Sequence, residues 1–207
     1  QQPGDDDASR LDLIQVTATR FSEPVQEVPN AISVITGDEL RARGANDLRT
    51  ALALLGGVNV APGGDGGPAG AVPGLLGLRE VDDFLLVVDG VPAGGAFVPH
   101  FETLDLHNVE RIEVVRGTAP VYYGTTAFAG TINVIHFAAG KAPTEASASV
   151  GSFGSAEIEG AAVLSRETVR QSVAADFTRQ RGPDSRSGFD RLHGLYRAAS
   201  VVEEGSL

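Results

Sequence analysis

Three short runs decide the fold: VERIEVVRG at residues 109–117, YG at residues 123–124, and GTINVI at residues 130–135. Branched aliphatic residues fill the first and last runs, and glycines stand where the chain must turn. The pattern predicts a strand, a tight turn, a short helix and a second strand. A further run, FLLVV at residues 84–88, is continuously apolar and is closed by an Asp-Gly pair. It predicts a strand that is buried on both faces.

Two short helices are expected upstream of these strands. The sequence TGDE that starts at Thr36 has the spacing of a capping box, so Thr36 is expected to cap a helix that runs through Arg43 and ends at Gly44. Asn46 is expected to cap a second helix, which the glycine pair at residues 56–57 stops.

Two glycine- and proline-rich segments interrupt this pattern. Residues 61–77 contain seven glycines and three prolines, and residues 92–100 have a similar character. Such composition predicts loops without a regular element.

The sequence changes character after Pro143, where polar and apolar residues begin to alternate with a period of two. One predicted strand carries apolar side chains at Val169, Val173, Ala175 and Phe177 and polar ones at Arg170, Ser172, Asp176 and Thr178. Another sets Leu192, Gly194, Tyr196 and Ala198 against Arg191, His193 and Arg197. The alternation is typical of barrel strands between lipid and lumen, and an ordinary half-exposed antiparallel sheet gives the same pattern. At about 10 residues a strand, residues 144–207 hold roughly four strands.

Composition excludes several classes of protein. The net charge of −11 disfavours binding to nucleic acid, whose phosphates require basic patches. The absence of cysteine removes disulfides and thiolate metal sites. No run of ~18 apolar residues predicts a transmembrane helix. The first residue is not methionine, which is compatible with a mature end left by signal-peptide cleavage.

No catalytic arrangement emerges from the sequence. The GDGGPA run at residues 64–69 only loosely resembles a nucleotide-binding loop, because no amphipathic helix follows it. The histidines have no metal-ligand spacing; they are His100, His107, His136 and His193. We therefore expect no enzyme activity, no cofactor and no metal site.

Taken in order, the motifs resemble the plug domain of TonB-dependent outer-membrane receptors. The matching runs cover about residues 12–140; they are DLIQVTA at 12–18, PNAISVIT at 29–36, GANDL at 44–48, LLGGVNV at 54–60, LR at 78–79, VVDGVP at 87–92, and the three runs quoted first. The resemblance implies an α+β fold: a plug with a small mixed sheet and short helices, followed by antiparallel β-hairpins of an incomplete transmembrane β-barrel.

The resemblance also implies how the chain is divided. Residues 1–11 are expected to be a disordered leader, 12–18 the TonB box, 19–143 the plug domain and 144–207 the start of the barrel. Large plugged transporters have about 22 strands, and four strands cannot close. The chain is therefore expected to be a fragment, a truncated gene product or a deliberately shortened version.

The function implied by the resemblance is gating. The plug would lie inside a barrel in the outer membrane of a Gram-negative bacterium, facing the periplasm. It would admit a scarce nutrient of the ferric siderophore, haem or cobalamin class with energy transduced by TonB and its inner-membrane complex. The implied partners are TonB, outer-membrane lipid and the transported ligand. The alternatives are a non-transporting periplasmic binding or signalling module and a truncated remnant that keeps the plug as an interaction domain.

The resemblance assigns three groups of site residues. The TonB-binding segment is Asp12, Leu13, Ile14, Gln15, Val16, Thr17 and Ala18. Arg79 and Arg116 match family positions that latch the plug to barrel glutamates, and the neighbouring Glu80 is a competing partner for Arg79 where the family has glycine. The loops expected to contact ligand contribute Gly64, Asp65, Gly67, Phe97, His100 and Phe101.

Overall fold

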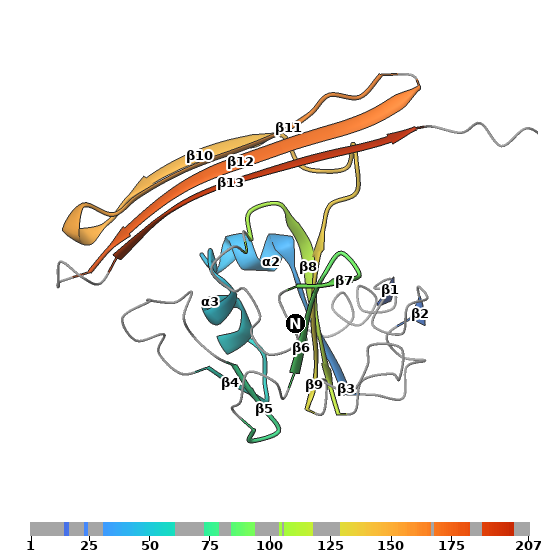
Figure 1. Cartoon of the computed structure of the whole chain (residues 1–207), viewed down its shortest axis with the longest axis vertical. Helices are drawn as coiled ribbons and strands as arrows, with labels where there is room; N and C mark the ends of the chain where they lie inside the picture. Colours follow the sequence, from blue (N-terminus) through green and yellow to red (C-terminus); the bar gives the residue numbers. More distant parts are fainter. Residues whose placement is uncertain are drawn as a thin grey trace, which may run out of the picture.

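Two sheets of different character make up the computed structural model. A long curved sheet arches over the end of an α+β unit, which we call the plug (Figure 1). The structure describes residues 31–60, 73–78, 84–93, 104, 106–117, 129–166, 168–182 and 188–200, and the backbone of two short strands at 15–16 and 23–24.

The plug is built on a five-stranded sheet in the order β3-β8-β9-β6-β7. Its strands are β3 (Ala31–Thr36), β6 (Phe84–Val88), β7 (Val91–Pro92), β8 (Val109–Arg116) and β9 (Gly130–His136). The β6–β9 pair is parallel and the other three pairs are antiparallel, so the sheet is mixed, as the resemblance implies. The turn and short helix expected around residues 118–128 lie outside the described residues.

The first helix confirms its predicted caps. Helix α2 spans Gly37–Ala42, and the Thr36 hydroxyl oxygen accepts a hydrogen bond from the Glu39 amide at 3.3 Å. The chain leaves the helix through Gly44, whose φ of +65° favours glycine. A Cβ at Gly37 would lie 2.1 Å from the Val109 carbonyl oxygen, so the helix starts in close contact with β8.

The second helix corrects one prediction. Helix α3 spans Leu48–Ala53, and its N-cap is Asp47 rather than Asn46. The Asp47 carboxylate accepts the Thr50 amide at 2.9 Å and the Thr50 hydroxyl at 2.8 Å. The Asn46 amide instead donates to Glu157 of the curved sheet at 3.0 Å. A long-range partner therefore occupies the side chain that local sequence assigns to the cap.

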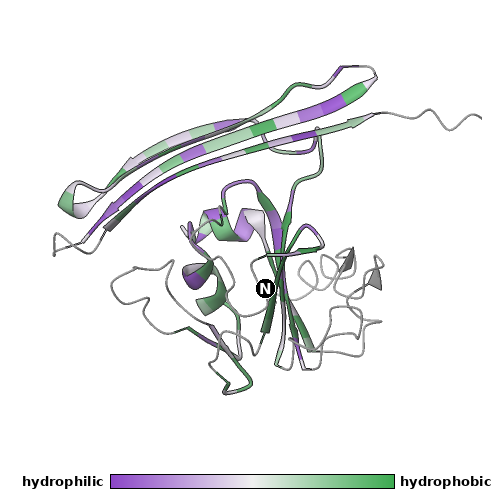
Figure 2. Ribbon diagram, in the orientation of Figure 1, coloured by the Kyte–Doolittle hydropathy of each residue, from purple (hydrophilic) through white to green (hydrophobic). Residues whose placement is uncertain are grey.

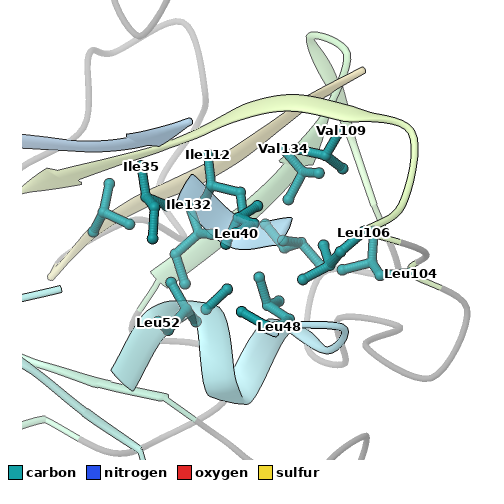
Figure 3. Packing of buried hydrophobic residues seen from close by; sticks show 14 of the residues in the cluster. Ile35, Leu40, Leu48, Leu52, Leu104, Leu106, Val109, Ile112, Ile132 and Val134 are labelled. Atoms are coloured by element: carbon teal, nitrogen blue, oxygen red, sulfur yellow. The ribbon is translucent and has the colours of Figure 1, made fainter. Parts of the chain in front are cut away.

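The core lies between the plug sheet and helix α3. Leu48 and Leu52 extend from α3 toward the sheet (Figure 3). The labelled core residues are Ile35, Leu40, Leu48, Leu52, Leu104, Leu106, Val109, Ile112, Ile132 and Val134, all buried. In β6, Phe84, Leu86 and Val87 are buried, in keeping with the prediction of a buried strand there.

A small antiparallel pair corrects the loop prediction for residues 61–77. Strand β4 (Val58–Val60) pairs with β5 (Pro73–Leu75), although proline and glycine occupy two of the three β5 positions. Leu75 is fully buried, and this burial fixes the strand against the core. Residues 61–72 lie outside the described part. A second short pair joins β1 (Gln15–Val16) to β2 (Glu23–Pro24).

The curved sheet is a four-stranded antiparallel meander. Its strands are β10 (Glu145–Val150), β11 (Ala156–Val163), β12 (Val169–Arg181) and β13 (Gly188–Ser200), with a short 3-10 turn, η5 (Ser152–Gly154), between the first two. The predicted four strands are confirmed, and the described strands form an open sheet. No helix among the described residues is long and apolar enough to cross a membrane.

Candidate functional site

The two faces of the curved sheet differ in polarity. Apolar and polar residues alternate along β12 and β13 (Figure 2). On the face directed away from the plug, Leu192 is 80% exposed and Tyr196 is 63% exposed. The other large exposed side chains of this outer face are Val150, Ile158, Val173 and Phe177. The opposite, inner face carries charged and polar groups, and it meets the plug.

Asp89 makes the first contact between the inner face and the plug. It occupies the β6–β7 turn with a φ of +50°, next to Gly90. Its carboxylate accepts the His136 amide and the His136 Nδ1 proton, each at 2.9 Å, and it also accepts a hydrogen bond from Arg197 of β13. Burial alone would raise the pKa of Asp89, but the His136 hydrogen bonds and the positive charge of Arg197 hold the pKa below its ordinary value.

His107 makes a second contact from the turn that precedes β8. Its Nε2 atom lies 2.6 Å from Glu159 Oε2 and 3.3 Å from Glu157 Oε1, both on β11. The three side chains are between 13% and 18% exposed. Asn46 and Thr178 also donate to Glu157, and Ser147 donates to Glu159. One plug histidine thus faces two carboxylates of the curved sheet.

A third cluster lies on the curved sheet itself and extends to the plug. Asp176 of β12 is buried, with Arg191 Nε at 3.6 Å and His193 Nδ1 at 3.5 Å. The Arg191 guanidinium also donates to the Leu104 carbonyl oxygen at 2.7 Å, which ties β13 to the plug. Through these three clusters, β11 and β13 of the curved sheet contact the plug by way of charged side chains.

A cavity of about 370 Å³ lies at one end of the interface. The turn before α3 forms one wall, and the adjoining ends of the curved-sheet strands form the other. Its arginines include Arg179 and Arg181, and both pair with Asp190, whose single negative charge compensates one of the two positive charges. Among the described residues no group of three or more histidine or acidic side chains is arranged to hold a metal ion.

Arg116 is the predicted latch residue that the structure describes. Its guanidinium donates to Ser33 Oγ at 2.5 Å and to the Gly56 carbonyl oxygen, both within the plug. It ends β8, roughly 23 Å along the strand from Val109 at about 3.3 Å per residue, and the curved sheet contacts the Val109 end. A latch to barrel glutamates therefore stays a prediction.

The remaining predicted site residues are mostly outside the described part of the chain. These are Arg79, the loop residues Gly64, Asp65, Gly67, Phe97, His100 and Phe101, and the TonB-box residues Asp12, Leu13, Ile14, Thr17 and Ala18. Gln15 and Val16 form strand β1. Their roles stay predictions.

The interface residues Asp89, His107, Glu157, Glu159 and Arg197 were not singled out by the sequence as a site. Part of the signal is visible there, since Glu157 and Glu159 share one face of a predicted strand. The curved-sheet residues of this interface lie about 50 residues or more along the chain from the plug residues that they contact, and no local pattern connects the two sets.

Comparison with known proteins gives a consistent family. The TonB-dependent receptor plug domain matches residues 24–131. The vitamin B12 transporter BtuB of Photobacterium profundum is 33% identical over 157 residues, which are 74% of this chain and 25% of that protein. The iron-regulated outer membrane virulence protein of Vibrio cholerae is 31% identical over 141 residues, which are 62% of this chain and 21% of that protein.

The solved structures agree in fold. The ferric yersiniabactin uptake receptor FyuA from Yersinia pestis superposes with a TM-score of 0.68 at 21% identity, over 84% of this chain and 29% of that one. The chain thus spans about a quarter of the length of the relatives it matches. The plug match covers more than half of the chain, and plug and antiparallel strands together have the fold of these receptors. The chain belongs to the TonB-dependent receptor plug domain family.

Proposed function

We propose that this chain is the gate, with the first barrel strands, of an outer-membrane receptor that imports a nutrient with energy from TonB. The gate is the plug, which blocks the lumen until a ligand binds. The ligand is of the ferric siderophore, haem or cobalamin class. The names of the relatives support this range, since one is a vitamin B12 transporter and a structural neighbour is a ferric yersiniabactin receptor.

One observation carries the proposal: the curved sheet is polar toward the plug and apolar away from it. A sheet in water would bury Leu192, Phe177 and Val173 and expose its charges. Here Asp176 is buried on the plug side, whereas those apolar side chains are exposed. Lipid is the environment that such an outer face fits, and the outer membrane is the compartment in which such strands are found.

We assign the binding of TonB, through which transport would receive its energy, to residues 12–18. Strand β1 already has extended backbone at Gln15–Val16 and pairs with only two residues of β2. A strand held by so few main-chain bonds can exchange its partner for a strand of TonB. Main-chain hydrogen bonds of this kind give binding affinity without requiring one exact sequence.

A peptide titration tests this assignment. A peptide of residues 8–22 is expected to bind the C-terminal domain of TonB. Val16→Pro should abolish binding because proline removes a main-chain donor, whereas Val16→Thr keeps both the donor and the β-branched side chain and should bind nearly as well. Equal binding by the native and Val16→Pro peptides, measured by calorimetry, would overturn the assignment.

Arg116 and Arg79 are proposed to latch the closed gate in the complete receptor. Arg116 is the stronger candidate, because Glu80 is adjacent to Arg79 and competes for its charge. Arg116→Ala should raise outer-membrane leakage of a large antibiotic more than Arg79→Ala does, in cells matched for receptor abundance. Equal leakage would contradict the ranking.

A further inference from the structure

We propose that His107 is a positioning residue whose protonated imidazole clamps the plug to strand β11, so that docking of the plug on the curved sheet depends on pH. The inference deepens the proposed function and rests on it only for the consequence in transport. Docking itself can be measured on this chain without any transport.

The first argument is geometric. His107 presents one nitrogen, Nε2, to two carboxylates, at 2.6 Å and 3.3 Å. In the neutral form, the ring lies beside both carboxylates without any net charge, and the buried Glu159 Oε2 accepts no hydrogen bond from the described residues. Protonation of the ring adds a full positive charge beside two negative ones. The charged form is therefore the one that holds β11 in place.

The second argument concerns the carboxylates. Glu157 and Glu159 are two residues apart on one strand and share the inner face, so they repel each other. Both are largely removed from water, which weakens solvent screening of that repulsion. A cation between them relieves it, and without one the pair favours separation of β11 from the plug.

The third argument is that the ion pairs described for Glu157 and Glu159 are both made with His107, while Arg191 of β13 shares the Thr178 hydroxyl with Glu157. Asn46, Thr178 and Ser147 are neutral donors to the two carboxylates. The nearby plug arginines are engaged elsewhere: Arg41 pairs with Asp38, and Arg111 pairs with Glu110 and Glu113.

The remaining charged groups that face this site lie on the curved sheet. Glu145 of β10 lines a small cavity together with His107 and Glu159. Asp176 of β12 is opposite Glu159 in the strand register and is accompanied by Arg191 and His193 of β13. The positive charge of Arg191 offsets that of Asp176, and Glu145 adds a further carboxylate to this neighbourhood. His193 is the second titratable ring in this neighbourhood and needs its own control.

Distance measurement between two spin labels tests the proposal on the 207-residue chain in detergent micelles. The chain has no cysteine, so Asn59→Cys on the plug and Val150→Cys on the curved sheet give a unique pair of labels at exposed positions. In the native sequence, the ratio of undocked to docked chain should rise about tenfold between about pH 6 and about pH 9, in line with the loss of a charged hydrogen bond.

Three variants separate the effect of His107 protonation from other effects of pH. His107→Gln should show the high undocked ratio at both pH values, and His107→Lys should stay docked at both because its charge persists. His193→Gln should keep the pH dependence of the native sequence. A pH-independent distance in the native sequence, or an unchanged pH dependence in His107→Gln, would overturn the proposal. If His107→Gln does not fold, the comparison of His107→Lys with the native sequence decides the matter. A negative result here leaves the TonB-peptide titration unaffected.

Discussion

The plug buries its apolar side chains, whereas the curved sheet exposes them on its outer face. Ile112 and Ile132 of the plug are fully buried between sheet and helix. Leu192 and Tyr196 of the curved sheet are mostly exposed, and the polar Asp176 is buried in their stead on the opposite face. The plug therefore holds its own core, whereas the curved sheet contacts charged plug residues on its inner face and exposes apolar side chains on its outer face, where the proposed function places lipid.

The largest expected difference comes from removing apolar volume in each region. Ile112→Ala should destabilise the plug by about 2–5 kcal/mol because it leaves a cavity in a closed core. Leu192→Ala, at a side chain that is already exposed, should change the stability in water by less than about 0.5 kcal/mol. Urea unfolding followed by circular dichroism measures both. Similar losses for the two variants would mean that Leu192 is buried in solution, and the contrast would fail.

Replacement of a glycine by alanine is expected to change the stability in opposite directions in the two regions. A Cβ at Gly130 would lie 2.1 Å from the Val115 carbonyl oxygen, and its φ is +152°. Gly130→Ala should therefore cost about 2–3 kcal/mol. Gly194 in β13 has nothing within 4 Å of a Cβ. Gly194→Ala should stabilise its strand by about 0.5 kcal/mol. Thermal unfolding of both variants tests the pair, and a neutral Gly130→Ala would show that β8 and β9 are less tightly packed than described.

A smaller effect is expected at the contact that joins the regions through Asp89. Asp89→Asn weakens the acceptor for His136 and Arg197 and should cost about 1–2 kcal/mol. The pKa of Asp89 is lowered in the folded chain, so the carboxylate contributes stability above its ordinary value of 3.8, and that contribution is lost as the pH falls through the lower folded value.

Measurement of the free energy of unfolding as a function of pH checks the direction of this pH dependence. The difference between the native sequence and Asp89→Asn should be full near pH 6 and should shrink below about pH 4. Glu110→Gln is a suitable control, because the ion pair described for Glu110, with Arg111, lies within the plug. A difference that grows on acidification would contradict the account of Asp89.

The fold was largely predictable because its signals are local. The capping box at Thr36, the apolar run at residues 84–88 and the alternation after Pro143 each act within one element. Asn46 shows where this reasoning fails, since the side chain that suits the cap is drawn to Glu157 across the interface. Strand β5 was missed because burial of Leu75 outweighs the low strand propensity of its neighbours.

The interface was less predictable than the fold. The inner-face residues of β11 and β13 follow from the period of two, but their partners depend on how the curved sheet lies over the plug. His107 and Asp89 stand in turns, where sequence does not reveal the direction of a side chain. Arg116, which resembles a latch residue in its motif, contacts Ser33 and Gly56 in the described part of the chain.

Hydrogen exchange of the full chain, compared in water and in detergent micelles, tests the division of the molecule most directly. Amides around Val87, Val114 and Val134 should exchange slowly in both, because the plug core is complete in itself. Amides between Ser147 and Tyr196 should exchange fast in water and become protected only in micelles. Equal protection of the two regions in water would show that the curved sheet belongs to a compact soluble domain, and the account of a gate beneath lipid-facing strands would be wrong.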